Sequence, residues 1–577
     1  MRTETKQCQN CKQDFVIEPD DFAFYEKVKV SPPTWCPECR MQRRFVWRNE
    51  RGLHKRKCGL CGKETISMYA PDVRMNVYCS DCWWSDKWDP MVYGQEYDSH
   101  TPLLDQFRVL HEKVPVPALW VFNSVDCDYA NHGGHNKNVY LSSSVIYSED
   151  ISYCTGMDWS KICLDSDFVA ESEWCYENSH SFKNYHVLFA LRSRECLNSL
   201  FLYDCVNCQD CFMSNNLRNK RYMFRNEQCT KEKYAARLAQ IDFGSYRVIV
   251  SLRKEFADLV SRSLHKYADI VKSDRVVGDD IRKSKNVKSS FRIGDCENIG
   301  YSWRMIRSRD VYDVSGALDS EMIYEATIAS EYNYLCKFYY QTKESKNCEY
   351  VSNNINISHC FACIGLRNKQ YCILNKQYTK EEYEELVPKI IQQMNSMPYL
   401  GKNDRVYKYG EFFPVEFSPF AYNETVAQEY FPLTKEQTIE KGYCWKDPEE
   451  KYYKITKKSE DLPDNIKDVF DSILEDVIQC SHNQTCNEQC TQAFKIVKEE
   501  LQFYRKMNLP LPHLCPNCRH YERLKQRNPL KLWHRQCMCD RNHPHHNGRC
   551  PNEFETSYSP DRPEIIYCER CYQQEVV

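Results

Sequence analysis

A repeating pattern begins in KNVYLSSSVIYSEDISYC, residues 137–154. Short β-prone segments alternate with Ser, Asn and Asp, and apolar anchors recur about every 12 residues. The anchors are Val139, Ile151, Ile162, Trp174, Tyr185 and Cys196. A fixed period with like residues favours stacked coils over an antiparallel sandwich. The spacing therefore predicts a parallel β-helix-like solenoid over residues 120–228, and two segments per turn would give coils of about 23 residues.

The same rhythm returns in residues 291–377, which predicts a second β-solenoid segment. Its anchors are Ile299, Val311, Ile323, Tyr334, Cys348, Cys360 and Tyr371. The two stretches end alike, in NLRNKRYMFRNEQCTKEKY (216–234) and GLRNKQYCILNKQYTKEEY (365–383). Each ending leads into an expected helix, with Thr230 and Thr379 as N-caps.

The central cysteines are predicted to be small apolar residues inside the coils. This applies to Cys154, Cys163, Cys175, Cys196, Cys205, Cys336, Cys348 and Cys372. Two denser clusters, CVNCQDC and CFAC, leave a further metal site and a plain cysteine ladder both open. Their members are Cys205, Cys208 and Cys211 in one and Cys360 and Cys363 in the other.

The N-terminal cysteines form four C-x2-C pairs, which are Cys8/Cys11, Cys36/Cys39, Cys58/Cys61 and Cys79/Cys82. Two thiolates from one such turn grip a tetrahedral zinc ion, and a second turn completes the site. Residues 1–95 are therefore predicted to be a zinc-ribbon module with two metal sites. Spacing alone leaves sequential and cross-braced pairing open. Zinc is the expected metal, although all-thiolate sites also accept iron.

The C-terminal end repeats this module, because FYEKVKVSPPTWCPECR (24–40) returns as FYRKMNLPLPHLCPNCR (503–519). A second module with two sites is predicted over residues 480–577, giving about four zinc ions in total. The expected ligands are Cys486, Cys490, Cys515, Cys518, Cys537, Cys539, Cys550, Cys568 and Cys571. Two pairs are irregular in this copy, so further donors near them could replace or supplement a ligand. These spare donors are Cys480, His482, His543, His545 and His546.

The connectors between the second and third cysteine pairs are basic and carry aromatic residues. Guanidinium groups pair with phosphates and stack on bases, so these segments predict nucleic-acid binding. The predicted contacts are Arg40, Arg43, Arg44, Arg48, Arg51, Lys55, Arg56, Lys57, Arg519, Arg523, Lys525, Arg527 and Arg535. An acidic protein partner, or acidic patches of the same chain, would suit the same residues.

The whole chain is nearly neutral, with 78 Lys and Arg against 81 Asp and Glu in 577 residues. It shows no apolar leader and no membrane-length stretch, and its 34 cysteines suit a reducing compartment. A cytoplasmic protein without a membrane partner is therefore expected. Because no Walker loop, H-E-x-x-H motif or nucleophile–base pair is found, neither an enzyme nor a small-molecule cofactor is expected.

The chain is thus predicted to be mainly β with helical insertions, two β-solenoid segments being flanked at both chain ends by duplicated four-cysteine zinc-ribbon modules. The remaining segments are a helical segment with a linker (229–285) and a helix with an irregular wrap (378–478). The modules would cap the open ends of the solenoid body, which otherwise expose unpaired strand edges.

A resemblance rests on FYEKVKVSPPTWCPECRMQRR, WRNERGLHKRKC and YCSDCWWSDKWDP, with the Asn-rich repeats and SPFAYNET. These motifs resemble a group of uncharacterised bacterial zinc-ribbon proteins from small-genome, uncultured lineages. The resemblance covers most of the chain and implies no activity.

Three functions follow from the residues. The first is a zinc-stabilised cytoplasmic scaffold that binds RNA, DNA or a nucleoprotein through the basic connectors. The alternative is a protein–protein interaction scaffold with purely structural zinc and a docking face on the solenoid. A carbohydrate-active β-helix enzyme is the third, and the residues favour it least.

Overall fold

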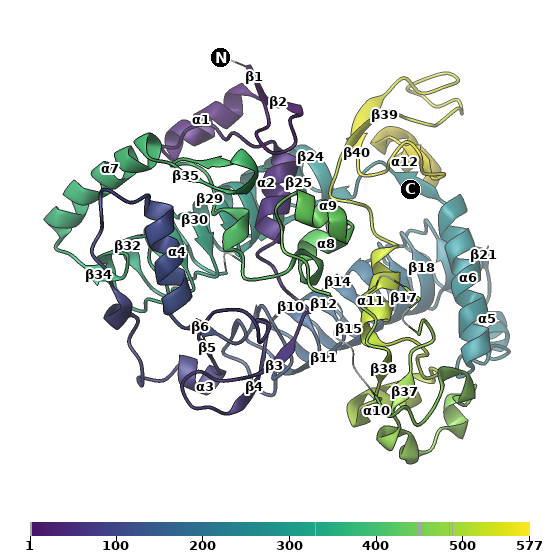
Figure 1. The fold of residues 1–577 in the computed structure, drawn as a ribbon. Coiled ribbons are helices and arrows are strands. Elements are labelled where there is room, and N and C mark those ends of the chain that lie inside the picture. The colour runs from purple at the N-terminus through teal and green to yellow at the C-terminus, as the bar shows by residue number, and fades with distance from the viewer. Residues whose placement is uncertain (1–2, 329, 448–452, 484, 487) are drawn as a thin grey trace.

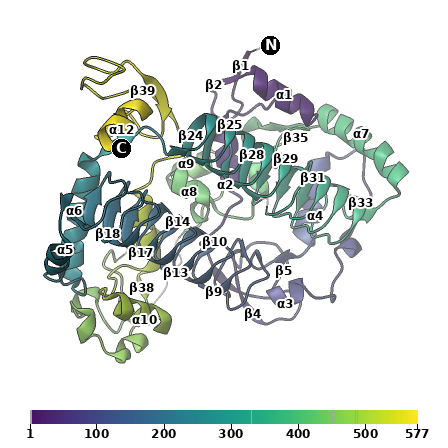
Figure 2. The ribbon, with the colours of Figure 1, turned by 180° about the vertical axis from the view of Figure 1, so that it is seen from behind.

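The computed structural model describes residues 3–328, 330–447, 453–483, 485–486 and 488–577. Two β-solenoids form its centre, and the helices and the two cysteine-rich modules surround them (Figure 1). The view from behind shows the two stacks of strands as separate columns (Figure 2). The predicted fold class, mainly β with two solenoids and cysteine modules at both ends, is confirmed.

The first solenoid is a 15-stranded sheet with parallel pairing between its coils. Its strands are β7 (Val121–Phe122), β8 (Gly133–Gly134), β9 (Lys137–Tyr140), β10 (Ser143–Ile146), β11 (Glu149–Ser152), β12 (Thr155–Asp158), β13 (Lys161–Leu164), β14 (Asp167–Ala170), β15 (Glu173–Tyr176), β16 (Ser179–Phe182), β17 (Tyr185–Leu191), β18 (Leu197–Tyr203), β19 (Phe212–Asn215), β20 (Met223–Phe224) and β21 (Glu227–Gln228).

The second solenoid is a 12-stranded sheet that starts earlier than predicted. Its strands are β23 (Ile270–Val271), β24 (Asp274–Arg282), β25 (Lys285–Gly294), β26 (Glu297–Gly300), β27 (Trp303–Ile306), β28 (Arg309–Leu318), β29 (Glu321–Thr327), β30 (Lys337–Tyr340), β31 (Lys346–Ser352), β32 (Ser358–Phe361), β33 (Gln370–Ile373) and β34 (Lys376–Gln377). β24 lies within the predicted linker, whose charged residues sit mostly on the outside of a coil while Ile281 is buried.

The α-helices lie between and around these columns. They are α1 (Pro19–Lys27), α2 (Pro37–Phe45), α3 (Ser80–Trp83), α4 (Leu103–Lys113), α5 (Lys231–Leu238), α6 (Tyr246–Arg262), α7 (Lys380–Ser396), α8 (Val426–Tyr430), α9 (Lys435–Glu440), α10 (Lys498–Met507), α11 (Pro516–Leu524) and α12 (Glu569–Val576). Thr230 and Thr379 cap α5 and α7 as predicted. Among the described residues, no helix combines the length and the apolar character that crossing a bilayer requires.

Each coil is half as long as predicted. Ile151 pairs with Cys163, and Cys163 pairs with Cys175, so one repeat of 12 residues is a complete coil with two short strands. The coil closes so tightly because nearly every third residue has a positive φ, for example Asp150 at 56° and Tyr153 at 57°. The prediction of about 23 residues per coil is wrong because it did not anticipate these repeated left-handed corners.

Small polar side chains form ladders inside the coils. The Ser142 hydroxyl donates to the carbonyl of Tyr140 (2.9 Å) and accepts the N–H of Cys154 (3.0 Å). The Cys154 thiol likewise donates to the carbonyl of Ser152 (3.2 Å) and accepts the N–H of Ser166 (3.3 Å). Serine and cysteine side chains therefore have the same role, because both form hydrogen bonds with backbone groups that water cannot reach.

Ser160 tests this ladder, because its hydroxyl donates to the carbonyl of Asp158 and accepts the N–H of Ser172. Ser160→Ala leaves that buried N–H without an acceptor and is expected to cost about 1–3 kcal/mol of unfolding free energy. Ser160→Cys keeps a donor and an acceptor and should cost clearly less. Urea denaturation of both variants checks this, and an equal loss in the two would contradict the ladder.

Each cysteine-rich module touches both solenoids. In the first module, α2 packs on β28 and β29 of the second solenoid, whereas β5 (Val77–Tyr78) pairs in parallel with β6 (Val116–Pro117), which leads into the first solenoid. In the second module, β41 (Ile565–Tyr567) pairs with β22 (Leu264–Lys266), which precedes the second solenoid.

The helix α11 of the second module lies on the first solenoid, so the two modules are arranged as counterparts (Figure 1). In each module one strand pairs with the strand that precedes a solenoid, but the two-stranded sheets β5–β6 and β22–β41 are separate from the solenoid sheets. The helices α2 and α11 lie against coils in the middle of a solenoid. The modules are therefore brackets that join the two columns, and their capping of the open ends stays a prediction.

The segment after α7 crosses the first module, as the predicted wrap requires. Trp47 packs against Phe412, Phe413 and Tyr340, with ring centroids 5.3–6.1 Å apart. Module, wrap and second solenoid consequently share one aromatic core.

Candidate metal centres

Four groups of four cysteines bring their sulfur atoms within 4.8 Å of one another, close enough to ligate one ion each. The groups are Cys8/Cys11/Cys36/Cys39, Cys58/Cys61/Cys79/Cys82, Cys480/Cys490/Cys515/Cys518 and Cys537/Cys550/Cys568/Cys571. Neighbouring pairs along the chain thus join each other, and the pairing is sequential rather than cross-braced. All-thiolate tetrahedral sites suit zinc.

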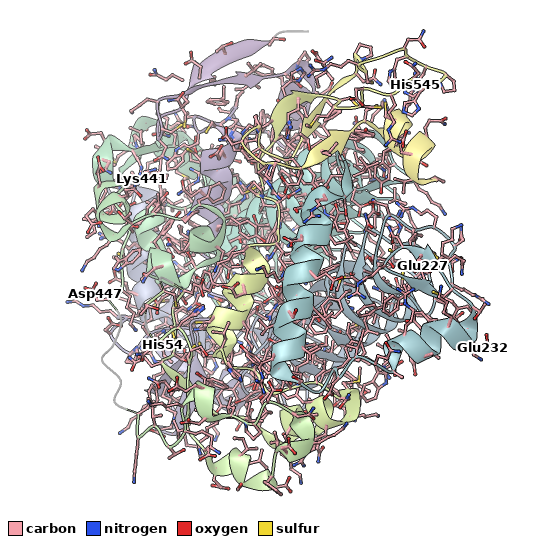
Figure 3. All side chains as sticks on the ribbon, turned by 90° about the vertical axis from the view of Figure 1, so that its right-hand side faces the viewer. His54, Glu227, Glu232, Lys441, Asp447 and His545 are labelled. Atoms are coloured by element: carbon pink, nitrogen blue, oxygen red, sulfur yellow. The ribbon has the colours of Figure 1, made fainter. Side chains whose placement is uncertain are left out.

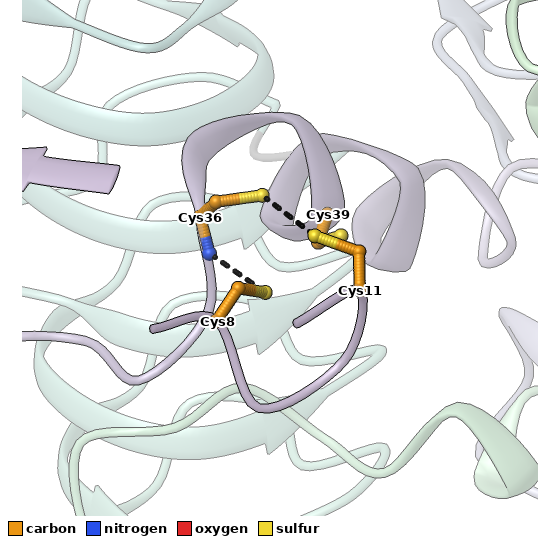
Figure 4. Close-up of side chains that lie close together, drawn as sticks. All are labelled: Cys8, Cys11, Cys36 and Cys39. Carbon is orange, nitrogen blue, oxygen red and sulfur yellow. Dashed lines mark hydrogen bonds between the residues drawn. The ribbon is translucent and has the colours of Figure 1, made fainter. Parts of the chain in front are cut away.

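The first site is built by a hairpin and a helix start (Figure 4). The strands β1 (Glu4–Gln7) and β2 (Asp14–Ile17) carry Cys8 and Cys11 on their turn, and Cys36 precedes α2. The Cys11 and Cys36 sulfurs are 3.8 Å apart, and the backbone N–H of Cys36 donates to Cys8 Sγ at 3.2 Å. Backbone donors of this kind stabilise the thiolate form that a metal ion needs.

The second site repeats this plan on the hairpin of β3 (His54–Lys57) and β4 (Glu64–Ser67). The N–H of Cys79 donates to Cys58 Sγ at 3.3 Å. Burial opposes ionisation of Cys58, but the backbone N–H groups of Cys61, Cys79 and Leu60 lower its pKa to about 6. The site is therefore prepared for a cation.

The third site differs from the prediction by including Cys480, which was expected only as a spare donor. Cys480 joins the group, whereas Cys486 Sγ lies beside it, 3.8 Å from Cys518 Sγ. Cys480 is the counterpart of Cys8, since the N–H of Cys515 donates to its sulfur at 3.3 Å. The sequence signal for this ligand was the dipeptide Gln-Cys, which occurs at Gln7-Cys8 and again at Gln479-Cys480. The longer turn between Cys480 and Cys490 obscured this correspondence.

This correction predicts a difference between two serine variants. Cys480→Ser should remove one zinc equivalent from the purified protein, because three thiolates hold zinc more weakly than four. Cys486→Ser should leave the zinc content unchanged. Elemental analysis after dialysis against a mild chelator measures both, and loss of zinc in the Cys486 variant alone would reverse the assignment.

The fourth site uses Cys550 where the first module has Cys61. The N–H of Cys568 donates to Cys537 Sγ at 3.2 Å, and the Cys550 and Cys568 sulfurs are 3.9 Å apart. Cys539 lies outside this group and belongs to a second set with His543, His546 and Cys571. Cys537 and Cys539 thus belong to different groups and do not act as a pair of ligands for one ion.

The interior cysteine clusters make the hydrogen bonds that the ladder interpretation predicts, and the alternative of a further metal site there stays a prediction. The thiols of Cys205, Cys208 and Cys211 donate to backbone carbonyls two residues earlier at 3.3–3.5 Å, and so do Cys360 and Cys363. All five are buried inside the coils. Their hydrogen-bonding role is that of the ladder serines.

The basic connector of the first module is buried against the second solenoid. Arg40 and Arg44 reach Asp313 at 2.9 and 3.1 Å. Arg43 and Arg44 reach Glu325 at 2.7 and 3.2 Å. All five side chains are within 1% of full burial, so their charges are neutralised inside the protein.

The second connector repeats these contacts on the first solenoid. Arg519 and Arg523 each reach Asp165 at 2.8 Å, and Arg523 reaches Asp167 at 3.1 Å. Burial opposes ionisation of Asp167, but Arg523, Arg527 and His520 hold its pKa well below the ordinary value. The carboxylates of the solenoid are therefore charged partners for the arginines.

The two sets share the same pattern of contacts, and we call each an arginine lock. Arg44 Nη2 donates to the carbonyl of Tyr301 (3.2 Å), and Arg523 Nη2 donates to that of Tyr153 (3.0 Å). The tyrosine hydroxyls in turn donate to an acid of the preceding helix, in the pairs Tyr301–Asp21 (3.0 Å) and Tyr153–Glu500 (2.8 Å). The first lock thus comprises Arg40, Arg44, Asp313, Tyr301 and Asp21, and the second Arg519, Arg523, Asp165, Tyr153 and Glu500.

These contacts correct the predicted nucleic-acid surface. Seven of its arginines are buried, namely Arg40, Arg43, Arg44, Arg48, Arg519, Arg523 and Arg527. The prediction is wrong for them, because a phosphate cannot reach a buried guanidinium. The alternative of acidic patches on the same chain describes their role. Composition could not distinguish the two, since both require the same basic residues.

The other predicted contacts are more accessible but mostly engaged. Arg56 and Arg535 are counterparts that donate to backbone carbonyls of their own modules. Lys525 pairs with Glu488 and Glu522, and Arg51 donates to Asn517 Oδ1 at 3.1 Å. Lys55 and Lys57 project from β3 and are exposed.

A cleft of about 480 Å³ lies where the two modules meet the first solenoid. The solenoid contributes Tyr129, Tyr140 and Tyr153, and the modules contribute Leu53 and Phe494. Its charged lining includes Arg51, His54, Lys495, Glu50, Glu424 and Asp447. Figure 3 shows His54 and Asp447 on the same side of the molecule.

Comparisons with known proteins give little more. No family model and no curated protein matches the sequence. One solved structure, described as a "putative acetyltransferase" from Desulfovibrio desulfuricans, aligns at 11% identity and a TM-score of 0.11. The alignment covers 41% of this chain and 65% of that chain. A score this low carries no argument about fold or activity.

Proposed function

We propose that the protein is a non-catalytic scaffold for a protein partner and that its zinc sites are structural. The duplicated arginine lock carries this proposal. The arginines of the connectors pair with carboxylates of the chain's own solenoids. Each module, with its metal sites, therefore acts as a bracket that joins the two solenoids. Metal-held modules need little core of their own, which suits a bracket.

The cleft between the modules is the surface on which we place the partner. Its carboxylates are already paired, in the contacts Glu50–Arg48, Glu424–His54 and Asp447–Lys435. In the described part of the chain, Arg51 and Lys495 of the cleft form no ion pair. Tyrosine and leucine side chains beside unpaired cations suit an acidic peptide segment with apolar anchors.

Site-specific photo-crosslinking in the producing cells tests this proposal. Leu53→p-benzoylphenylalanine places the probe in the cleft, and Val250→p-benzoylphenylalanine places it on the exposed face of α6 as the control. We expect a nuclease-resistant protein adduct at position 53 only. Adding Arg51→Glu and Lys495→Glu should remove it, because the charge attraction is reversed.

Two results would overturn the proposal. Equal adducts at both positions would mean that the cleft is not selective. A nuclease-sensitive adduct would instead support the nucleic-acid scaffold, which would then rest on the exposed Lys55 and Lys57 rather than on the buried arginines.

A further inference from the structure

The last metal site has more donors than one ion can use. Cys539, His543, His546 and Cys571 lie within 4.8 Å of one another, and Cys571 also belongs to the group of Cys537, Cys550 and Cys568. Two complete sets of four donors therefore share one sulfur. Zinc in a structural site takes four ligands, so the second set is surplus for a single ion.

The histidines are positioned by the backbone. The N–H of His543 donates to the carbonyl of His546 at 2.9 Å, and the reverse bond is 3.2 Å. His546 Nδ1 lies 2.8 Å from the carbonyl of Gly548, so Nδ1 carries the proton and Nε2 is left as an acceptor. That Nε2 faces Cys571 Sγ at 3.1 Å. Fixing one ring nitrogen on a carbonyl is how proteins orient a metal-binding histidine.

His543 supplies an independent observation. Its side chain is only 7% exposed, and its Nε2 lies 3.5 Å from Glu575 Oε1 without forming a hydrogen bond to any of the described residues. A buried imidazole nitrogen without a hydrogen bond is costly unless something else satisfies it. Cys539 is completely buried as well. A cation among these donors would satisfy the nitrogen and neutralise the thiolates.

We propose that the C-terminal module binds two zinc ions bridged by the Cys571 thiolate. One ion takes Cys537, Cys550, Cys568 and Cys571, and the other takes Cys539, His543, His546 and Cys571. Two divalent ions offset four of the five thiolate charges that the two sets of donors would carry when both are occupied. Sulfur and imidazole donors suit zinc, and a thiolate has lone pairs for two metals.

The first module serves as the internal comparison. Between Cys58 and Cys61, the counterparts of Cys537 and Cys550, it has only Gly59 and Leu60, so its second site holds one ion. The additional ion is thus a property of the insert in one copy. It lies at the periphery, where Figure 3 shows His545 at the outer edge of the C-terminal module. This peripheral position makes the ion the first that a chelator should remove.

Metal stoichiometry and X-ray absorption of the full-length protein test the proposal. The zinc-loaded wild type should contain one zinc more than its four four-cysteine groups, and its spectrum should show a Zn–Zn distance of roughly 3.5–4 Å. His543→Ala/His546→Ala should lose one equivalent and the Zn–Zn signal. His534→Ala, an exposed histidine on β39 (Trp533–Gln536) of the same module, should lose neither.

If the double variant fails to fold, the zinc content and the X-ray absorption spectrum of the wild type still test the proposal. One zinc for each four-cysteine group, with no Zn–Zn scattering, would overturn it. So would a folded double variant with unchanged zinc content, because the histidines would then not be ligands.

Discussion

Arg44→Leu is expected to lower the unfolding free energy by about 3–5 kcal/mol. Arg44 bonds to both Asp313 and Glu325, and both carboxylates are fully buried. Removing the guanidinium leaves them without enough counter-charge in a medium that penalises charge. Urea denaturation of the zinc-loaded protein measures the loss. Hydrogen exchange should then show α2 exchanging faster.

Two comparisons control this prediction. Arg523→Leu removes the counterpart arginine and should loosen α11 instead of α2 while costing a similar free energy. Lys57→Ala removes an exposed cation from the same connector and should change stability by less than about 0.5 kcal/mol. If the two arginine variants resembled the lysine variant, the locks would contribute nothing to docking.

Cys36→Ser is also expected to have a large effect, because it removes a donor of the first candidate metal site. Zinc binding supplies on the order of 10 kcal/mol to a structural module, so a weakened site should release the hairpin of β1 and β2 and the start of α2. The zinc content should fall by one equivalent. Limited proteolysis should cut near residues 8–36 in the variant and spare the wild type.

Cys163→Ser is the matched control, since Cys163 is also a buried cysteine. Its thiol donates to the carbonyl of Lys161, a bond that a serine hydroxyl can also make. The variant should keep its zinc and its resistance to protease. Loss of zinc in this variant would mean that interior cysteines bind metal and that the ladder interpretation is incomplete.

The solenoid could be predicted from the sequence because the spacing of its repeats equals the spacing of residues that pair in neighbouring coils. Residues that meet in the structure, such as Ile151 and Cys163, are one coil apart, so repetition in sequence is repetition in space. Coil length could not be read from the same period. It depends on left-handed residues such as Asp150 and Tyr153, and nothing in their side chains requires that conformation.

The metal sites were largely predictable, since C-x2-C pairs encode two ligands of one ion locally. Prediction failed where a turn was lengthened, as between Cys480 and Cys490. The arginine locks were not predictable as locks, because Arg44 and Asp313 are far apart in the sequence and have no common pattern. A run of basic residues indicates that acidic partners exist, but it does not indicate which positions of the sequence supply them.

The central claim is that the arginine locks hold the two solenoids in place through the cysteine-rich modules. Small-angle X-ray scattering of the zinc-loaded Arg44→Glu/Arg523→Glu protein tests it most directly. The account predicts a larger radius of gyration than in the wild type, with zinc content and β-sheet circular dichroism unchanged. An unchanged radius of gyration in a folded, fully metallated variant would contradict it.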